Sequence, residues 1–562
     1  MNPFMVAGVL ASLAAALAST PAATVPAPLH YRIDARLDAS SGVLSGRETV
    51  TWLNGAAIPR TIAVCAGAGQ RLATDGDRRA VLVAPGARAT LDLQWTAALL
   101  VPGQINAIAD HWYPRAALGA DARDPACAPA VPGRTAPDDP ADFEVSLAVP
   151  RGWLVGATGR EEAAGADGTL HRFQQRGVRE FSWVTGPQYL ERWRRIDGSS
   201  RAIDVRLLLL PEHAAQAGRL LDAAADALAQ HARWLSPYAA DHLTLVDAGW
   251  RDPAGDRSYP GLITFATRWR VPADVLSPEA AIARGISGQW WTGAVLLDGD
   301  PRLGDGIADY FAGLTVEHLF DVRHQELAYS AYARSYLGGF LPWSWSDVRV
   351  PRASAHRARA SRAFGTLERY LSAPVLQRAL AAVIERHHGA RLSRQEFFSV
   401  VGDAAGQDLR WFDEAVFAHS DAFDYAVGAV RTTTDATCGA SPCFRTDIVL
   451  ERRGGGQFTG SSEPPAGRYE SGRALRLTVA FADGQRADDT WDGRARTKTV
   501  SLRSRAAAVS AHLDPEAMLL LDGARTNNSW TSTPRAGLAS ARWAATWLTW
   551  LQDCLLQYAA LV

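Results

Sequence analysis

The chain is poor in lysine and in cysteine, and its charges almost cancel. Lys498 is the single lysine among 562 residues, so arginine carries nearly all of the positive charge. The formal net charge is −1, which argues against a nucleic-acid-binding protein because phosphate binding needs a strong basic surplus. Single hydrophobic cores stop growing well below this chain length, so the sequence predicts several domains.

The few cysteines carry a prediction about disulfides. Exported proteins tend to oxidise their cysteines in pairs. Cys438 and Cys443 lie in the turn CGASPC, close enough in sequence to bridge each other. A zinc knuckle would need two further ligands nearby, and none follows. The odd total of five leaves at least one thiol free, and Cys554 on an apolar helix is the expected one, while the pairing of Cys65 and Cys127 stays open.

The N-terminal segment is apolar and rich in small residues from Phe4 to Ala18. Ala16-Leu17-Ala18 fits a signal-peptidase site, although Met1 to Pro3 contains no lysine or arginine. The apolar run is too short for a membrane-spanning helix. We therefore expect a secretory signal peptide over residues 1–23 and a periplasmic or secreted protein of a bacterial cell envelope.

The periodicity of apolar residues changes twice along the chain. Alternation typical of strands runs to about Ile196, as in Tyr31–Leu37 and Phe143–Val149. Helical spacing dominates from Ala214 to about Phe423, and strand patterns return after it. The sequence thus predicts a multidomain α+β protein. Its expected parts are a β-sandwich-like domain (24–198), an α-rich domain (199–423), and a β domain with a terminal helix (424–562).

The terminal helix is expected to have a broad apolar face. Trp543, Trp547, Leu551 and Leu555 share that face, and charged residues such as Asp553 interrupt the pattern. A charge near the middle of a bilayer is costly, so a helix docked on a core is favoured. Membrane association as an interfacial helix remains the alternative.

Several short segments, taken in order, resemble the M1 family of zinc aminopeptidases, which are gluzincins. The early segments are YRIDARLD, LSGRETVTWLN, HWYPR, DFEVSLAVPRGWLVGATG and REFSWVTGPQY. The later ones are YPGLI, QWW, LGDGIADY, ASRAFGTLERYL and GQDLRWFDEAVF. The resemblance extends over nearly the whole chain after Tyr31 and is weakest in the C-terminal part. It implies that the α-rich domain is thermolysin-like.

The resemblance also locates the positions where that family binds zinc. Gluzincins use H-E-x-x-H on one helix and a glutamate on the next, with the first glutamate acting as general base. Here the H-E-x-x-H positions read Arg284-Gly285-Ile286-Ser287-Gly288, and Asp305 stands at the third ligand position. Ser258 replaces the glutamate that holds the substrate amine, and Ala360 lies near the position of the oxyanion-stabilising tyrosine. The resemblance thus implies that zinc ligands and base are missing.

The expected function is that of a catalytically inactive M1-like protein, a pseudo-metallopeptidase. It would bind peptide or protein, or act as a scaffold, and it would need no cofactor. The residues expected to line the groove at the lost site are Arg284, Gly285, Gly288, Asp305, Arg257, Ser258 and Asp309. The two arginines predict a preference for acidic groups. The alternatives are an active M1 metallopeptidase with an atypical zinc site and a purely structural interaction module; the sequence specifies neither the ligand nor the oligomeric state.

Overall fold

The structure is a computed structural model. It describes residues 29–67, 69–73, 78–99, 107–109, 111–118, 139–165, 167–248, 256–267, 277–298, 301–320, 352–419, 421–435, 443–460 and 474–533. Beyond these it describes only positions 537, 540, 541, 544, 548, 551 and 555. The predicted signal peptide over residues 1–23 lies outside the described residues.

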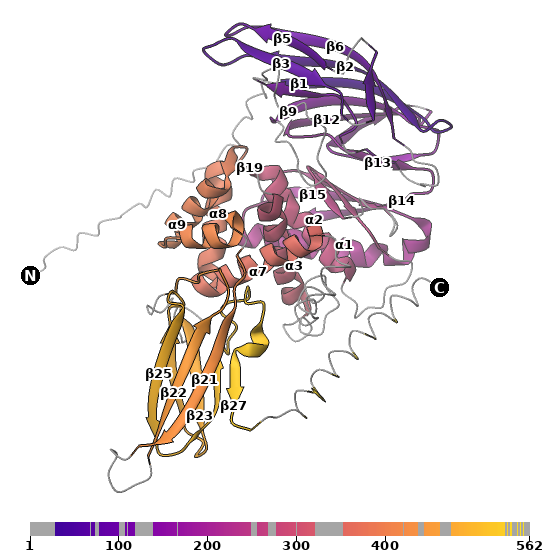
Figure 1. The fold of residues 1–562 in the computed structure, drawn as a ribbon. Helices are drawn as coiled ribbons and strands as arrows, with labels where there is room; N and C mark the ends of the chain where they lie inside the picture. The colour runs from indigo at the N-terminus through magenta and orange to yellow at the C-terminus, as the bar shows by residue number, and fades with distance from the viewer. Residues whose placement is uncertain are drawn as a thin grey trace, which may run out of the picture.

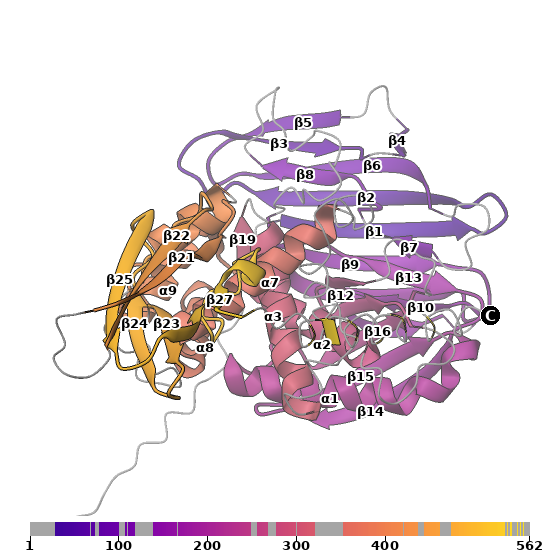
Figure 2. The ribbon, with the colours of Figure 1, turned by 60° about the horizontal axis from the view of Figure 1, so that its bottom comes forward.

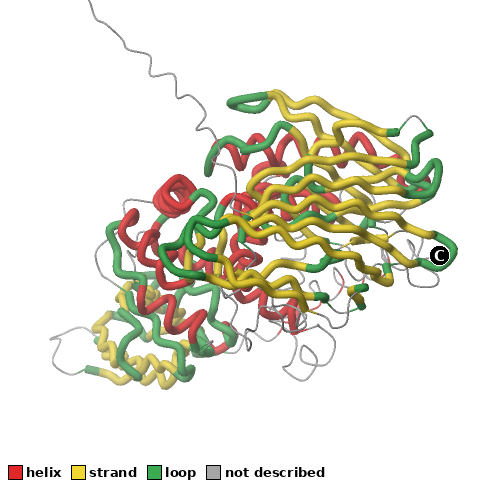
Figure 3. The backbone as a smooth tube through the Cα atoms, turned by 90° about the horizontal axis from the view of Figure 1, so that it is seen from above, coloured by secondary structure: helices red, strands yellow, loops and turns green. Residues whose placement is uncertain are grey.

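The molecule is a multidomain α+β protein, as predicted. Strands from the N-terminal third lie at one end, helices fill the middle, and a second group of strands lies at the other end (Figure 1). Seen from above, the long N-terminal strands run side by side over part of the helical region (Figure 3). The finer assignments, sandwich-like and thermolysin-like, stay predictions.

The N-terminal part is built on a seven-stranded sheet of order β11-β12-β9-β1-β2-β6-β4. Two three-stranded sheets, β10-β13-β7 and β5-β3-β8, accompany it. The strands are β1 (Leu29–Asp38), β2 (Val43–Leu53), β3 (Arg60–Cys65), β4 (Gln70–Leu72), β5 (Arg78–Val83), β6 (Arg88–Ala98), β7 (Ala107–Ala109), β8 (Arg115–Leu118), β9 (Ala141–Ala148), β10 (Leu154–Ala157), β11 (Arg160–Ala164), β12 (Leu170–Val178) and β13 (Trp183–Gly186). Buried and exposed residues alternate along β1 and β6, which confirms the predicted half-buried strands.

The middle part begins with a five-stranded sheet of order β14-β15-β16-β18-β17. Its strands are β14 (Leu190–Asp197), β15 (Ala202–Leu209), β16 (His242–Asp247), β17 (Arg257–Tyr259) and β18 (Leu262–Phe265). Strands β15, β16 and β18 are parallel, and β14 and β17 are antiparallel at the two edges. The expected boundary at residue 198 falls in the connection between β14 and β15, which are paired along their whole length.

The helices of the middle part lie within the region where the sequence predicted helical spacing. They are η2 (Pro211–Gln216), α1 (Ala217–Trp234), α2 (Ser277–Gly288), η3 (Gln289–Ala294), α3 (Pro301–Phe320), α7 (Arg352–Leu371), α8 (Ala373–His387), α9 (Arg394–Ala405), α10 (Arg410–Phe412) and η4 (Asp413–Ala418). Short strands β19 (Leu296–Asp298) and β20 (Arg391–Ser393) pair between them. Helices α1 and α2 pack against the five-stranded sheet. Helix α2 also packs against α1 and α3, and α3 packs against α7. Trp291, Phe311, Phe364 and Phe397 are fully buried between these helices.

The C-terminal strands form two sheets, β21-β22-β25 and β24-β23-β26-β27. They are β21 (Tyr425–Thr434), β22 (Phe444–Arg452), β23 (Leu475–Phe481), β24 (Arg486–Trp491), β25 (Thr497–Ser504), β26 (Ala508–Leu513) and β27 (Ser529–Thr531), with a short helix η6 (Arg525–Asn527). Their buried residues belong to the same hydrophobic cluster as the helices of the middle part. Figure 2 shows these strands beside the helical region.

The terminal segment differs from the expected docked helix at the positions that the structure describes. Leu548, Leu551 and Leu555 are exposed, so these three side chains do not pack into a core. Trp543 and Trp547 lie outside the described residues. Among the residues that the structure describes, no helix is both long and apolar enough to cross a membrane.

Both cysteines that the structure describes, Cys65 and Cys443, take part in disulfide bonds. Cys438, Cys127 and Cys554 lie outside the described residues, so the pairing of Cys438 with Cys443 stays a prediction. Disulfides are typical of oxidising compartments.

Candidate functional site

Three elements bring the predicted site residues together. Strand β17 carries Arg257 and Ser258, helix α2 carries Arg284, and helix α3 carries Asp305 and Asp309. Helix α2 packs on both strand β17 and helix α3. The two aspartates are four residues apart, so they lie on one face of α3, one turn above the other.

The guanidinium group of Arg284 bridges the two helices. Its Nε donates to Asp309 Oδ1 at 2.6 Å, and its Nη2 donates to Asp305 Oδ1 at 3.2 Å. Its Nη1 donates to the backbone oxygen of Asp256 at 3.3 Å, which ties the same group to the start of β17. The side chain of Arg284 is only 18% exposed. All three nitrogens of the guanidinium therefore have protein acceptors.

The carboxylates around Arg284 keep it protonated. Burial works to lower the pKa of Arg284, but the charges of Asp309, Asp305 and Asp256 outweigh burial and raise this pKa above its ordinary value. Arginine has no lone pair to give a metal ion. The position that the resemblance assigns to the first zinc-binding histidine thus carries a permanent cation.

The charge balance does not support the expected preference for acidic ligands. Three carboxylates, those of Asp256, Asp305 and Asp309, surround Arg284, and even with Arg257 counted they outnumber the guanidinium groups. Asp305 is 45% exposed, whereas Arg284 is mostly covered. A ligand that approaches Arg284 meets the carboxylate of Asp305 first, and the excess of carboxylates over guanidinium groups favours a cationic group over an anionic one.

Gly285, at the position that the resemblance assigns to the general base, lies against strand β18. A Cβ atom added to Gly285 would lie 2.4 Å from Cγ2 of Ile263. No side chain fits there unless Ile263 moves. A similar close approach occurs between Gly306 of α3 and Ala360 of α7, where an added Cβ would lie 2.5 Å from the Ala360 Cβ. The helices and the strand pack at a distance that leaves no room for a carboxylate base.

A hydrogen-bond network centred on Gln289 fixes strand β17 to the end of α2. Gln289 Nε2 donates to Ser258 Oγ at 2.7 Å and to the backbone oxygen of Tyr259 at 2.9 Å. Its Oε1 accepts from the backbone nitrogen of Gly261 at 2.8 Å. Ser258 Oγ in turn donates to the backbone oxygen of Gly285 at 2.8 Å. Ser258 therefore fixes the local backbone and has already used its hydrogen.

Sequence reasoning missed the structural role of Gln289. In the sequence, Gln289 was notable only as part of the QWW segment, although it is buried and holds the turn between β17 and β18. Gly288 ends helix α2 directly before it. A buried amide next to a strand-turn-strand is a signal for this role, because buried polar groups need hydrogen-bond partners.

The described residues contain no group of three or more His, Cys, Asp or Glu side chains arranged to hold a metal ion. Asp305 and Asp309 are both held by Arg284. Ser287 is fully buried and is therefore not presented as a nucleophile.

No protein-family model matches this chain, and no curated protein matches it.

Proposed function

We propose that this chain is a non-catalytic relative of the M1 aminopeptidases in which Arg284 takes the structural place of zinc. It would act as a peptide-binding, protein-binding or scaffold protein in the cell envelope. The observation that carries the proposal is the pairing of Arg284, at the first histidine position, with Asp305, at the third ligand position.

In this proposal Arg284 keeps the structural role of the zinc ion, which is to link two helices. In the family that the sequence resembles, zinc links the motif helix to a carboxylate of the next helix. Here a guanidinium on α2 makes that link directly, with Asp309 as a second anchor. Arginine suits this role because its planar group can engage two carboxylates at once and stays charged when partly buried. A cation on the chain itself replaces a bound cation.

No side chain at the corresponding positions can act as the general base or bind the substrate amine. Peptide hydrolysis by this family requires a metal-activated water and a base that takes its proton. Gly285 has neither a side chain nor room for one, and Ser258, at the amine-binding position, is hydrogen-bonded to Gly285 O. An active zinc enzyme at these positions would first have to expel Arg284 from its ion pairs.

The disulfides of Cys65 and Cys443 support a location in the cell envelope, since the cytosol keeps thiols reduced. The predicted signal peptide points to the same compartment.

A turnover assay tests the proposal. Aminoacyl-p-nitroanilides of basic, acidic and apolar residues are incubated with the purified chain, with and without added zinc. We expect no rate above that of the Arg284→Ala/Asp305→Ala variant, which serves as the control for contaminating peptidase. Turnover that disappears in this variant and on chelation would contradict the proposal and support the atypical metallopeptidase.

A further inference from the structure

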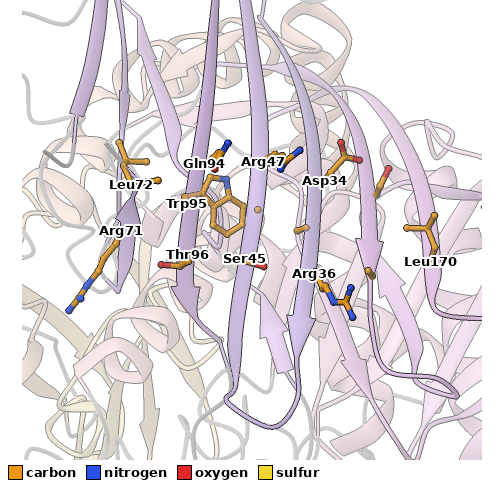
Figure 4. A pocket seen from close by; sticks show the side chains of 15 residues that line it. Asp34, Arg36, Ser45, Arg47, Arg71, Leu72, Gln94, Trp95, Thr96 and Leu170 are labelled. Carbon is orange, nitrogen blue, oxygen red and sulfur yellow. The ribbon is translucent and has the colours of Figure 1, made fainter. Parts of the chain in front are cut away.

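A hollow of about 490 Å³ lies on the outer, solvent-facing side of the seven-stranded sheet. It is far along the chain from the Arg284 site and is lined from strands β1, β2, β4, β6, β9 and β12. Figure 4 shows the side chains of Arg36, Arg47 and Arg71 around it, each from a different strand. The hollow is independent of the proposed pseudo-peptidase site.

The charged side chains of the hollow are three arginines and one carboxylate, Asp34. Arg36, Arg47 and Arg71 are all exposed. Within the described part of the chain, none of their guanidinium groups makes a hydrogen bond or an ion pair. Asp34 lies opposite Arg47 in the strand register, yet no ion pair joins them. The three guanidinium groups therefore face solvent, and no acceptor in the described part of the protein binds them.

Neutral polar residues fill the space between the arginines. One cross-strand row reads Arg71, Thr96, Ser45 and Arg36, each directly opposite the next. Neighbouring strands lie about 4.8 Å apart, so the backbones of Arg71 and Arg36 are separated by roughly 14 Å along this row. The row suits an elongated ligand with anionic groups at intervals and hydroxyl groups between them.

We propose that this hollow binds an acidic polysaccharide, a chain of uronate sugars. Guanidinium groups pair with carboxylates, often through two parallel hydrogen bonds, and the hydroxyls of Ser45 and Thr96 can exchange hydrogen bonds with sugar hydroxyls.

An acidic peptide fits less well. Extended peptides bind to sheets at a free strand edge, and β1, β2 and β6 are interior strands with both edges paired. Single-stranded nucleic acid binds through stacking on aromatic side chains, and the one aromatic residue of the hollow, Trp95, is 2% exposed. The polar row with free arginines therefore favours the uronate chain.

The test uses polygalacturonate and its fully methyl-esterified, neutral form as probes, titrated calorimetrically against the full chain at low salt. The hollow variant is Arg36→Gln/Arg47→Gln/Arg71→Gln. The matched control is Arg486→Gln/Arg496→Gln/Arg505→Gln, which removes three exposed arginines from strand β24 and from the two ends of β25. Both variants carry the same net charge, and circular dichroism checks that both fold.

Wild type is expected to bind polygalacturonate and not the neutral polymer. The hollow variant should lose about tenfold in affinity, equivalent to about 1.4 kcal/mol. The control should lose less than about twofold, because isolated surface charges contribute little. Absence of binding to polygalacturonate, equal losses in the two variants, or equally tight binding of poly-glutamate would each overturn the proposal, the last in favour of an acidic peptide.

Discussion

Replacement of Arg284 by alanine should destabilise the helical middle of the protein. The change removes the two ion pairs that join α2 to α3 and leaves Asp309, whose side chain is only 23% exposed, without its partner. Breaking a fully buried ion pair costs about 3–5 kcal/mol, and an exposed one about 0–1 kcal/mol. Arg284 is 18% and Asp305 45% exposed, so this site lies between the two cases. We expect a loss of about 2–3 kcal/mol.

The assay is urea unfolding followed by tryptophan fluorescence, with the midpoint as the readout because a multidomain chain need not unfold in one step. Arg233→Ala is the matched control, since Arg233 is exposed on the neighbouring helix α1, and its midpoint should shift little. Asp309→Asn should cost more than Asp305→Asn, because Asp309 makes the shorter contact and is more buried. An Arg284→Ala variant as stable as the Arg233→Ala control would refute the structural role of Arg284.

Three further predictions concern stability and covalent structure. Burial raises the pKa of Glu48 well above 4.5. Above pH 4.5 the Glu48 carboxyl is therefore ionised in the unfolded chain but still neutral in the folded protein. The free energy of unfolding consequently falls as the pH rises above about 4.5. Glu48→Gln should therefore gain in melting temperature relative to wild type as the pH increases from 5 to 8; a constant difference would contradict this. Gly285→Glu, which restores the family's base, should be destabilised by about 2 kcal/mol or more because of the contact with Ile263, and Ile263→Ala in the same chain should recover part of the loss. Peptide mapping under non-reducing conditions should recover Cys438 linked to Cys443, and recovery of either as a free thiol would exclude that bridge.

The sequence predicted most regular elements because their periodicity is local. Alternating burial in β1 and helical spacing in α1 follow from side-chain direction alone. The capping box of α9, formed by Ser393 and Glu396, is a similarly local signal. The pairing of strand β14 was not predicted, because its partner β15 lies beyond the predicted domain boundary.

The candidate site was predicted in its residues but not in its electrostatics. The resemblance of short segments to the M1 family placed Arg284 and Asp305 at one expected site, and an ion pair joins them in the structure. Pairing with Asp309 and with the Asp256 backbone depends on how α2 crosses α3 and β17, which no local pattern specifies. The sequence therefore suggested a free cation and a preference for acids, whereas packing provides the cation with carboxylate partners. The close contact of Gly285 with Ile263 also depends on tertiary packing and could not be predicted from a local sequence pattern.

The most direct test of the central claim is the zinc content of the protein, measured by elemental analysis of chain purified without chelator and then dialysed against micromolar zinc. If Arg284 has replaced the metal, zinc should stay well below one atom per chain, and the Arg284→Ala variant should not restore it because Gly288 still lacks a ligand. One zinc atom bound per wild-type chain, lost on substitution of Asp305 and Asp309, would contradict the replacement and mean that these carboxylates hold a metal.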